Sequence, residues 1–127
     1  MLKTNFVLLA FVCFLLPAPA MAGAGENDEF VMPSGNIKCV HGITDEYAGI
    51  YCLREQPSVM SLRYINGKVD WQDAEGDQPF MDAPPVFEYG QNKVYDDMTC
   101  ASSESGISCW QGSSGFNFSR KGVEEFK

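Results

Sequence analysis

The sequence has little of what catalysis, metal binding and nucleic-acid binding usually require. Its 127 residues include one histidine, no Cys-x-x-Cys pair and no Gly-x-Ser-x-Gly segment. A zinc site therefore lacks ligands, and a Ser–His–Asp triad would depend on His41, an acid such as Asp45 and a serine that nothing marks. Only 9 Lys and Arg stand against 17 Asp and Glu, without a basic cluster. Because phosphates need a basic surface, nucleic acid is not an expected partner.

Long hydrophobic runs are also scarce. The one such run, Phe6–Leu16, has eleven residues, fewer than the roughly 18 to 20 that span a bilayer. It follows Lys3 and precedes Ala20-Met21-Ala22, which is the pattern of a signal peptide with a small-residue cleavage site. Cys13 fits this run as an apolar residue better than as a site of lipid attachment. We therefore expect a secreted or periplasmic protein that does not span the membrane after cleavage near Ala22.

The remaining chain is short enough for one domain, because domains centre on roughly 100–150 residues. We expect a signal peptide at residues 1–22, a flexible acidic leader at 23–29, and a single β domain at 30–127. The formal net charge of −8 favours solubility and would speed encounter with a cationic partner.

Removal of the signal peptide leaves an even set of four cysteines: Cys39, Cys52, Cys100 and Cys109. In a small exported chain such a set predicts disulfides and not a metal site. Four cysteines allow three connectivities, of which sequence proximity favours Cys39–Cys52 with Cys100–Cys109. We expect no metal and no cofactor.

Apolar residues come in short runs between turn formers, and no apolar stripe keeps helical spacing for three turns. This pattern predicts an all-β fold, a small disulfide-stabilised antiparallel sandwich or barrel of hairpins. Asn66-Gly67 suits a two-residue type I′ turn between two such runs. The predicted strands are residues 30–32, 37–41, 49–53, 62–65, 68–71, 86–89, 93–95, 98–101, 107–110 and 116–119, followed by a turn or short helix at 123–126.

A Ser-Gly pair precedes an apolar run at Gly35, Gly106 and Gly115. Glycine at these places is typical of turns that need a positive φ. A duplicated hairpin unit is the alternative interpretation.

Several segments together carry a resemblance to a known family. They are Phe30-x-x-Pro33-Ser34-Gly35-Asn36-Ile37-x-Cys39, Tyr89-Gly90, Cys100-x-Ser102-Ser103-x-Ser105-Gly106-Ile107-x-Cys109 and Gly115-Phe116-x-Phe118-Ser119-Arg120. The chain resembles a family of secreted bacterial domains of unknown function, although a further cysteine pair of that family is absent and its Thr-Gly-His-Gly-Phe histidine is replaced by Ser114. The resemblance implies an exported, disulfide-linked β domain and brings no activity with it.

The segment from Asp73 to Pro85 combines acids, Gly and Pro, which predicts an exposed loop. We expect a binding surface there. Asp70 with the acids of this loop could gather around calcium, but the spacing does not fit an EF-hand. The residues of the predicted surface are Trp71, Asp73, Glu75, Asp77 and Phe80. Aromatic residues such as Trp71, Phe80, Tyr89, Tyr95 and Trp110 are, however, more often core residues in a small sheet.

These observations favour a non-enzymatic binding module, whose partner would be a cationic protein or an envelope component. The alternatives are an inhibitor of a cationic secreted enzyme such as a lysozyme, by weak fold-level analogy, and a small hydrolase. We expect Arg120 to be structural, with its stem over Phe116 and Phe118 and its guanidinium on Glu124 or Glu125.

Overall fold

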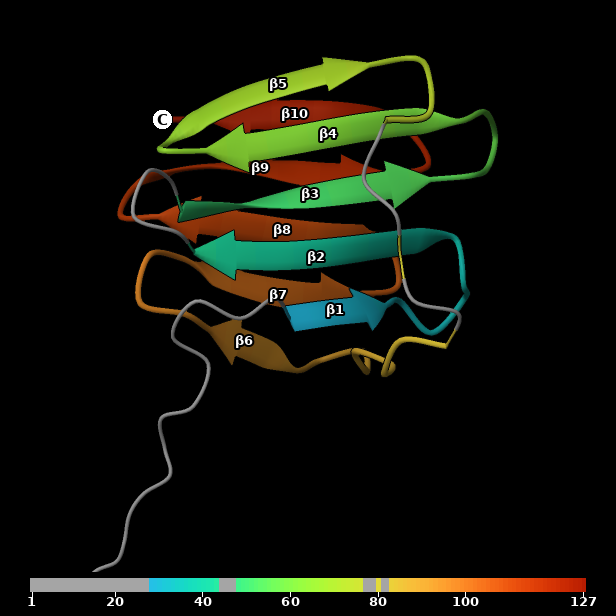
Figure 1. Ribbon diagram of the computed structural model, residues 1–127, viewed down its shortest axis with the longest axis horizontal. Helices are drawn as coiled ribbons and strands as arrows, with labels where there is room; N and C mark the ends of the chain where they lie inside the picture. Colours follow the sequence, from blue (N-terminus) through green and yellow to red (C-terminus); the bar gives the residue numbers. More distant parts are fainter. Residues whose placement is uncertain (1–27, 44–47, 77–79, 81–82) are drawn as a thin grey trace, which may run out of the picture.

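The computed structural model describes residues 28–43, 48–76, 80 and 83–127, so the predicted signal peptide lies outside the described residues. The described residues form ten strands in two antiparallel sheets, stacked face to face as a sandwich (Figure 1). Sheet A comprises β1 (Asp28–Val31), β2 (Ile37–Ile43), β3 (Ala48–Arg54), β4 (Met60–Ile65) and β5 (Lys68–Gln72). Sheet B comprises β6 (Asn92–Val94), β7 (Thr99–Ser103), β8 (Gly106–Gln111), β9 (Ser114–Ser119) and β10 (Gly122–Phe126).

In each sheet, every strand pairs with the strands that precede and follow it in the chain. Strands of equal rank overlie one another in Figure 1, so that β2 lies against β7 and β3 against β8. The prediction of an all-β antiparallel fold is confirmed, and the arrangement is a sandwich.

The hairpin predicted at Asn66-Gly67 is confirmed. Tyr64 pairs with Val69 and Ile65 with Lys68 across a two-residue turn. Both turn residues have a positive φ, 53° for Asn66 and 82° for Gly67, as a type I′ turn requires.

Three of the expected element boundaries are wrong. β1 begins at Asp28, inside the range predicted as a flexible leader, because Asp28 and Glu29 pair with β2. Residues 86–89 are not a strand, since Val86 forms only an isolated bridge with Val31. Residues 123–126 belong to β10 and not to a helix, because pairing with β9 satisfies their backbone groups.

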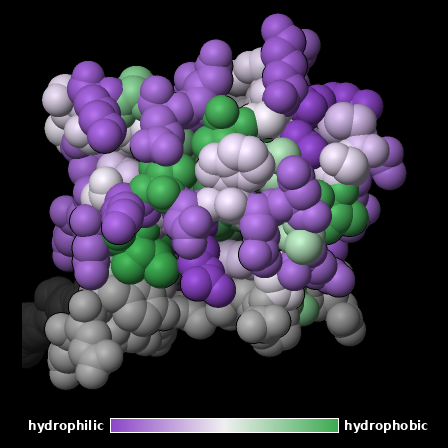
Figure 2. Space-filling model, turned by 90° about the horizontal axis from the view of Figure 1, so that it is seen from above, coloured by the Kyte–Doolittle hydropathy of each residue, from purple (hydrophilic) through white to green (hydrophobic). Residues whose placement is uncertain are grey.

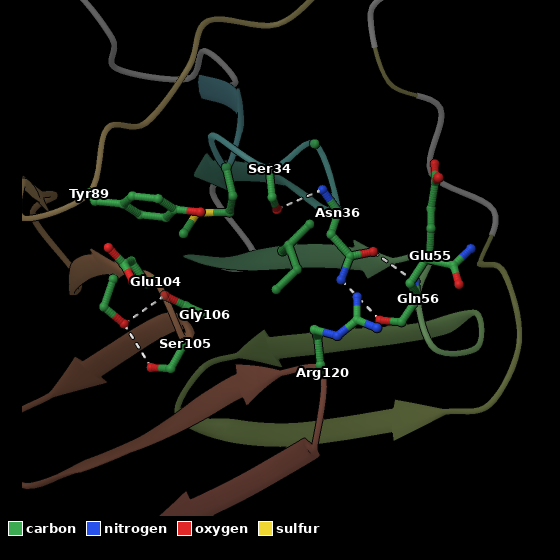
Figure 3. Close-up of a pocket in the computed structure, with 13 residues that line it drawn as sticks. Ser34, Asn36, Glu55, Gln56, Tyr89, Glu104, Ser105, Gly106 and Arg120 are labelled. Carbon is green, nitrogen blue, oxygen red and sulfur yellow. Dashed lines mark hydrogen bonds between the residues drawn. The ribbon is translucent and has the colours of Figure 1, made fainter.

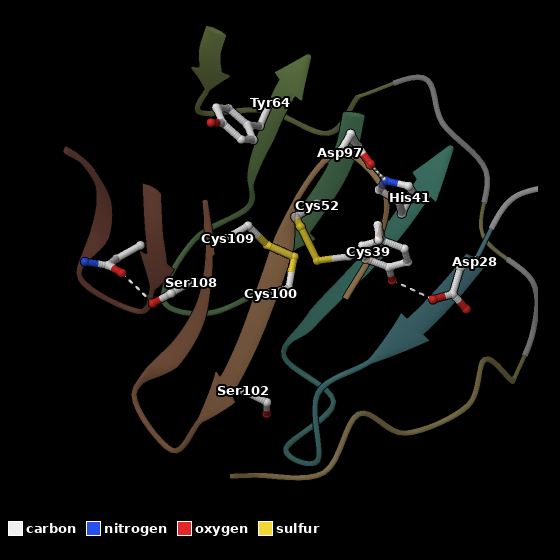
Figure 4. Close-up of a disulfide and its surroundings, with 12 residues drawn as sticks. Asp28, Cys39, His41, Cys52, Tyr64, Asp97, Cys100, Ser102, Ser108 and Cys109 are labelled. Carbon is white, nitrogen blue, oxygen red and sulfur yellow. Dashed lines mark hydrogen bonds and ion pairs between the residues drawn. A yellow bond between two sulfur atoms is a disulfide. The ribbon is translucent and has the colours of Figure 1, made fainter. Parts of the chain in front are cut away.

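The core fills the space between the two inner faces. Both disulfides lie there, Cys39–Cys52 between β2 and β3 and Cys100–Cys109 between β7 and β8, which confirms the predicted connectivity (Figure 4). In each case the two cysteines are directly opposite on neighbouring strands, with Cα atoms 4.1 Å apart. The largest fully buried side chains around them are Phe30, Ile50, Leu62, Tyr64, Phe87, Ile107, Phe116 and Phe118.

Of the aromatic residues singled out as core candidates, Tyr95 packs against that core, and the other four lie outside it. Trp71 is 47% exposed and Tyr89 is 40% exposed, while Phe80, Tyr95 and Trp110 are half-buried. Trp110 follows Cys109, which faces inward, so the strand alternation turns the tryptophan outward. Trp71 has an inward position, but it lies on an edge strand where little covers it.

The two sheets repeat one five-strand unit. Gly49-Ile50-x-Cys52 begins the middle strand of sheet A, and Gly106-Ile107-x-Cys109 begins the middle strand of sheet B. A Cβ atom at Gly49 would lie 2.4 Å from the Tyr64 carbonyl oxygen. At Gly106 it would lie 2.2 Å from the equivalent carbonyl oxygen, that of Phe118. The two middle strands therefore have the same register against the strand that follows each of them.

The connection between the sheets joins β5, at one edge of sheet A, to β6, at the opposite edge of sheet B. Gly76 and Phe80 of this connection contact Tyr51, which is buried although it faces outward. The chain thus covers part of one outer face with its own residues.

The edge formed by β5 and β10 is mostly hydrophilic, with small separate apolar areas (Figure 2). Lys68, Asp70, Glu124 and Glu125 are exposed along these two strands. Charges on an edge strand disfavour pairing with another chain. None of the described residues belongs to a helix long and apolar enough to cross a membrane.

Candidate functional site

A pocket of about 300 Å³ lies at one end of the sandwich, where turns from both sheets meet (Figure 3). We call it the end pocket. Five separate parts of the chain line it: Met32 and residues 34–37 around the β1–β2 turn, Glu55-Gln56 after β3, Tyr89, residues 103–106 between β7 and β8, and Arg120 between β9 and β10.

The wall from sheet A is fixed by the side chain of Asn36. Its Oδ1 atom accepts a hydrogen bond of 2.7 Å from the Gln56 backbone N–H, and its Nδ2 atom donates one of 2.9 Å to the Gln56 carbonyl. The Asn36 N–H donates to Ser34 Oγ, and Gly35 has a φ of 82°. The Pro-Ser-Gly-Asn segment is therefore a turn that holds the loop between β3 and β4 in place.

The wall from sheet B is the β7–β8 turn. The Ser103 and Ser105 hydroxyl oxygens are 2.9 Å apart in a hydrogen bond, and Ser103 Oγ also donates to the Gly106 carbonyl at 3.3 Å. Gly106 has a φ of 145°, which an L side chain rarely adopts.

Arg54, at the end of β3, joins sheet A to the β9–β10 turn of sheet B. Its side chain is 2% exposed, and all its partners are neutral. Nη1 donates to the Ser119 carbonyl at 2.9 Å and to the Arg120 carbonyl at 3.2 Å. Nε and Nη2 donate to the Ser58 carbonyl, and Nη2 also donates to the Ser58 hydroxyl. The sequence analysis missed Arg54, because an arginine at the end of a predicted strand carries no signal of burial.

Arg120 differs from its prediction. It is exposed, lines the end pocket and points toward Asn36 and Gln56 (Figure 3). Within the described residues its guanidinium forms no ion pair, so the predicted pairing with Glu124 or Glu125 is wrong. The reason is that β10 runs back along β9 and carries both acids away from the turn.

The end pocket brings together residues that lie far apart in the sequence. Most of the segments that carry the family resemblance contribute to it: Ser34-Gly35-Asn36-Ile37, Tyr89, Ser103, Ser105-Gly106 and Arg120. The sequence marked these segments as turns only. Their convergence depends on the stacking of the two sheets, because each sheet supplies only part of the lining.

The predicted acidic surface lies elsewhere. Asp73 and Glu75 are exposed at the start of the connection after β5, and Trp71 borders a separate hollow of about 80 Å³. Asp77 lies outside the described residues. The ring of Phe80 packs on Tyr51, with centroids 5.9 Å apart, so it contributes to covering sheet A. Binding at this surface stays a prediction.

His41, the histidine on which a triad would depend, is 3% exposed and faces the core. Its Nε2 atom lies 2.7 Å from Asp97 Oδ1, and its ring stacks on Tyr95 at 3.7 Å (Figure 4). The Tyr95 hydroxyl donates to Asp28 at 2.5 Å, and Lys93 forms an ion pair with the same carboxylate at 3.3 Å. This cluster ties the β6–β7 turn to sheet A at a place that does not line the end pocket.

The electrostatics of the cluster favour a neutral Tyr95. Burial raises its pKa above the ordinary value, and the hydrogen bond to Asp28 and the negative charges of Asp28 and Asp97 raise the pKa further. The pKa of Tyr64 is also raised, by burial and by the charge of Asp97. Among the described residues, no three His, Cys, Asp or Glu side chains gather closely enough to hold a metal ion.

Comparison of the chain with known proteins identified no relative. No family model, no curated protein and no solved structure matches the chain, so the family resemblance stays a prediction.

Proposed function

We propose that this protein is an exported, non-enzymatic module that binds an uncharged saccharide in the end pocket. The observation that carries this proposal is the lining, in which hydroxyl and amide side chains from both sheets face a hollow with one exposed aromatic ring, that of Tyr89, at its side (Figure 3). Concave sites with a few convergent polar groups are the usual form of small-ligand sites.

The lining matches the chemistry of a sugar. Ser34, Ser103 and Ser105 supply hydroxyl groups that donate and accept, as sugar hydroxyls also do. Tyr89 is 40% exposed, and an accessible aromatic ring can pack against the apolar side of a pyranose. The Arg120 guanidinium adds donors that no described residue uses.

Charge argues for an uncharged ligand. Glu55 and Glu104 line the end pocket together with Arg120, and the whole chain has a formal net charge of −8. A polyanionic glycan would therefore be repelled at long range.

Two observations support binding without catalysis. The one histidine of the chain, His41, does not line the end pocket. The two pocket carboxylates belong to different walls, and Glu55 points away from Glu104 in Figure 3. The inhibitor alternative needs a projecting acidic loop, whereas Gly76 and Phe80, two described residues of that loop, lie against Tyr51 of sheet A.

Titration calorimetry of the oxidised chain with N-acetylglucosamine and cello-oligosaccharides tests the proposal. We expect Tyr89→Ala to weaken binding at least tenfold. Trp71→Ala, which removes an equally exposed aromatic residue outside the end pocket, should leave binding unchanged.

The reverse pattern would contradict the proposal and favour the surface around Trp71. Absence of binding to every uncharged saccharide would also contradict it, and release of reducing ends during the titration would contradict its non-enzymatic part.

A further inference from the structure

A second hollow continues from the end pocket onto the outer face of sheet B. We call it the outer trough. Its volume is about 460 Å³, and the ends of β8 and β9 and the β9–β10 hairpin line it. Four residues line both hollows: Glu104, Ser105, Gly106 and Arg120. The two hollows are therefore separated only by the residues that they share, and together they form one path around the end of the sandwich.

The outer trough is a hollow because the outward-facing positions of β8 and β9 at this end carry small or short side chains. Ser108 and Asn117 face outward on β8 and β9 and are hydrogen-bonded to each other. At Gly106 no side chain fits, since a Cβ atom would meet the Phe118 carbonyl oxygen at 2.2 Å. Lys121 and Glu124 line the trough from the β9–β10 hairpin. Ile107 and Phe118 also line the trough, but both side chains are buried in the core, so the side chains that face the trough from β8, β9 and the hairpin are polar or charged.

Arg120 lies where the two hollows meet. Arg54 holds the Arg120 carbonyl, so the position of this turn is fixed from beneath. The Arg120 side chain is exposed and has no hydrogen bond or ion pair to any described residue. Its guanidinium donors are therefore available to hydroxyl or ring oxygens of a ligand that passes from one hollow to the other.

We infer that the ligand is an uncharged oligosaccharide of several units, which begins in the end pocket, passes Arg120 and continues into the outer trough. This inference rests on the proposed function and adds the length and path of the ligand. Volumes of 300 and 460 Å³ each fall in the range of sites for small molecules, so a single sugar would leave the trough empty.

An extended peptide fits the same path less well. Peptides that lie on sheet proteins commonly add a strand to a free edge. The face of the outer trough is formed by β8 and β9, which are both internal strands of sheet B. Their backbone groups are already paired.

Titration of the full oxidised chain with chito-oligosaccharides of one to six units tests the inference. We expect the affinity to rise at least tenfold between the disaccharide and the longest oligomers. Ser108→Gln fills the trough and should abolish this gain while leaving the disaccharide affinity unchanged. Asn92→Gln, at an exposed site on the outer face of β6, is the matched control and should keep the gain.

Arg120→Ala provides a second variant. It should reduce the affinity for the longest oligomers more than for the disaccharide. Its melting temperature should equal that of the parent, because the side chain has no hydrogen bond or ion pair to any described residue.

An affinity that is independent of oligomer length would overturn the inference and leave the proposed function intact, provided that Tyr89→Ala still weakens binding. Absence of saccharide binding would overturn both. Binding of an unstructured peptide library that Ser108→Gln reduces, without a length gain for saccharides, would assign the path to a peptide and also overturn the inference.

Discussion

Arg54 is a buried cation that has no carboxylate partner among the described residues. Its N–H groups are shared among the carbonyls of Ser58, Ser119 and Arg120 and the Ser58 hydroxyl, so the arginine joins sheet A to the β9–β10 turn. A lysine keeps the charge but has three donors on one atom and cannot reach both sides at once. We expect Arg54→Lys to lower the free energy of unfolding by about 2–4 kcal/mol, measured by urea denaturation.

Arg63→Lys is the matched control, because Arg63 is exposed on β4 of the same sheet. Its free energy of unfolding should stay within about 0.5 kcal/mol of the parent. Equal stability of the two variants would show that Arg54 does not join the sheets as described.

Tyr95 makes the free energy of unfolding depend on pH in the alkaline range. Its pKa is raised in the folded state by burial first, and then by Asp28 and Asp97. Above pH 10 or so, the unfolded chain loses the phenolic proton while the folded chain keeps it. The unfolded state then binds fewer protons, so stability falls as the pH rises, by at most about 1.4 kcal/mol per pH unit for this group.

Thermal melting between pH 8 and 11 checks this expectation. Tyr95→Phe should be less stable than the parent at pH 8, by about 1 kcal/mol, because the hydrogen bond to Asp28 is lost. Its melting temperature should fall less steeply with pH. Tyr89→Phe, at an exposed ring, should keep the parent's slope, and identical slopes for all three proteins would refute the role of Tyr95.

At the scale of elements, the middle strands β3 and β8 each need a glycine at their N-terminal end, at Gly49 and Gly106. A methyl group at Gly49 or Gly106 would overlap the backbone of the neighbouring strand. Gly106 also has a φ of 145°, whereas Gly35 has a positive φ with open space around it. We expect Gly35→Ala to cost about 1 kcal/mol, Gly49→Ala about 2–3 kcal/mol, and Gly106→Ala more than either.

Chemical denaturation of the three variants measures this order. If Gly49→Ala and Gly106→Ala were as stable as Gly35→Ala, β3 would not lie as close to β4, nor β8 to β9, as the structure shows.

Sequence patterns located a strand best where a residue pattern beside it fixes the backbone. Asn66-Gly67 identified the β4–β5 hairpin because a type I′ turn depends only on its own two residues. Residues 86–89 have an equally β-prone composition, yet they form only one bridge, to Val31. Strand formation there depends on a free neighbouring strand, which the local sequence does not report.

For the whole molecule, the two sheets share one core and should unfold together. Each sheet contains one of the two tryptophans, Trp71 in β5 and Trp110 in β8. Fluorescence of the single-tryptophan variants Trp71→Phe and Trp110→Phe therefore follows each sheet separately. We expect both to report the same denaturation midpoint as circular dichroism, after correction for the stability of each variant.

Circular dichroism on each variant supplies that correction. A midpoint for one tryptophan that differs from the circular dichroism midpoint of the same variant would mean that the sheets unfold as separate units, despite their joint core.

Features that depend on composition and on neighbours along the chain could be predicted before the fold was known. The all-β class, the Asn66-Gly67 turn and the two local disulfides follow from alternation, turn chemistry and cysteine spacing. Which residues share a site became clear from the folded chain alone. The end pocket unites segments from Ser34 to Arg120 because two equivalent sheets stack with their turns at a common end, and stacking depends on contacts between residues far apart in the sequence. For the same reason, burial of Arg54 and exposure of Tyr89 had no signal in the local sequence.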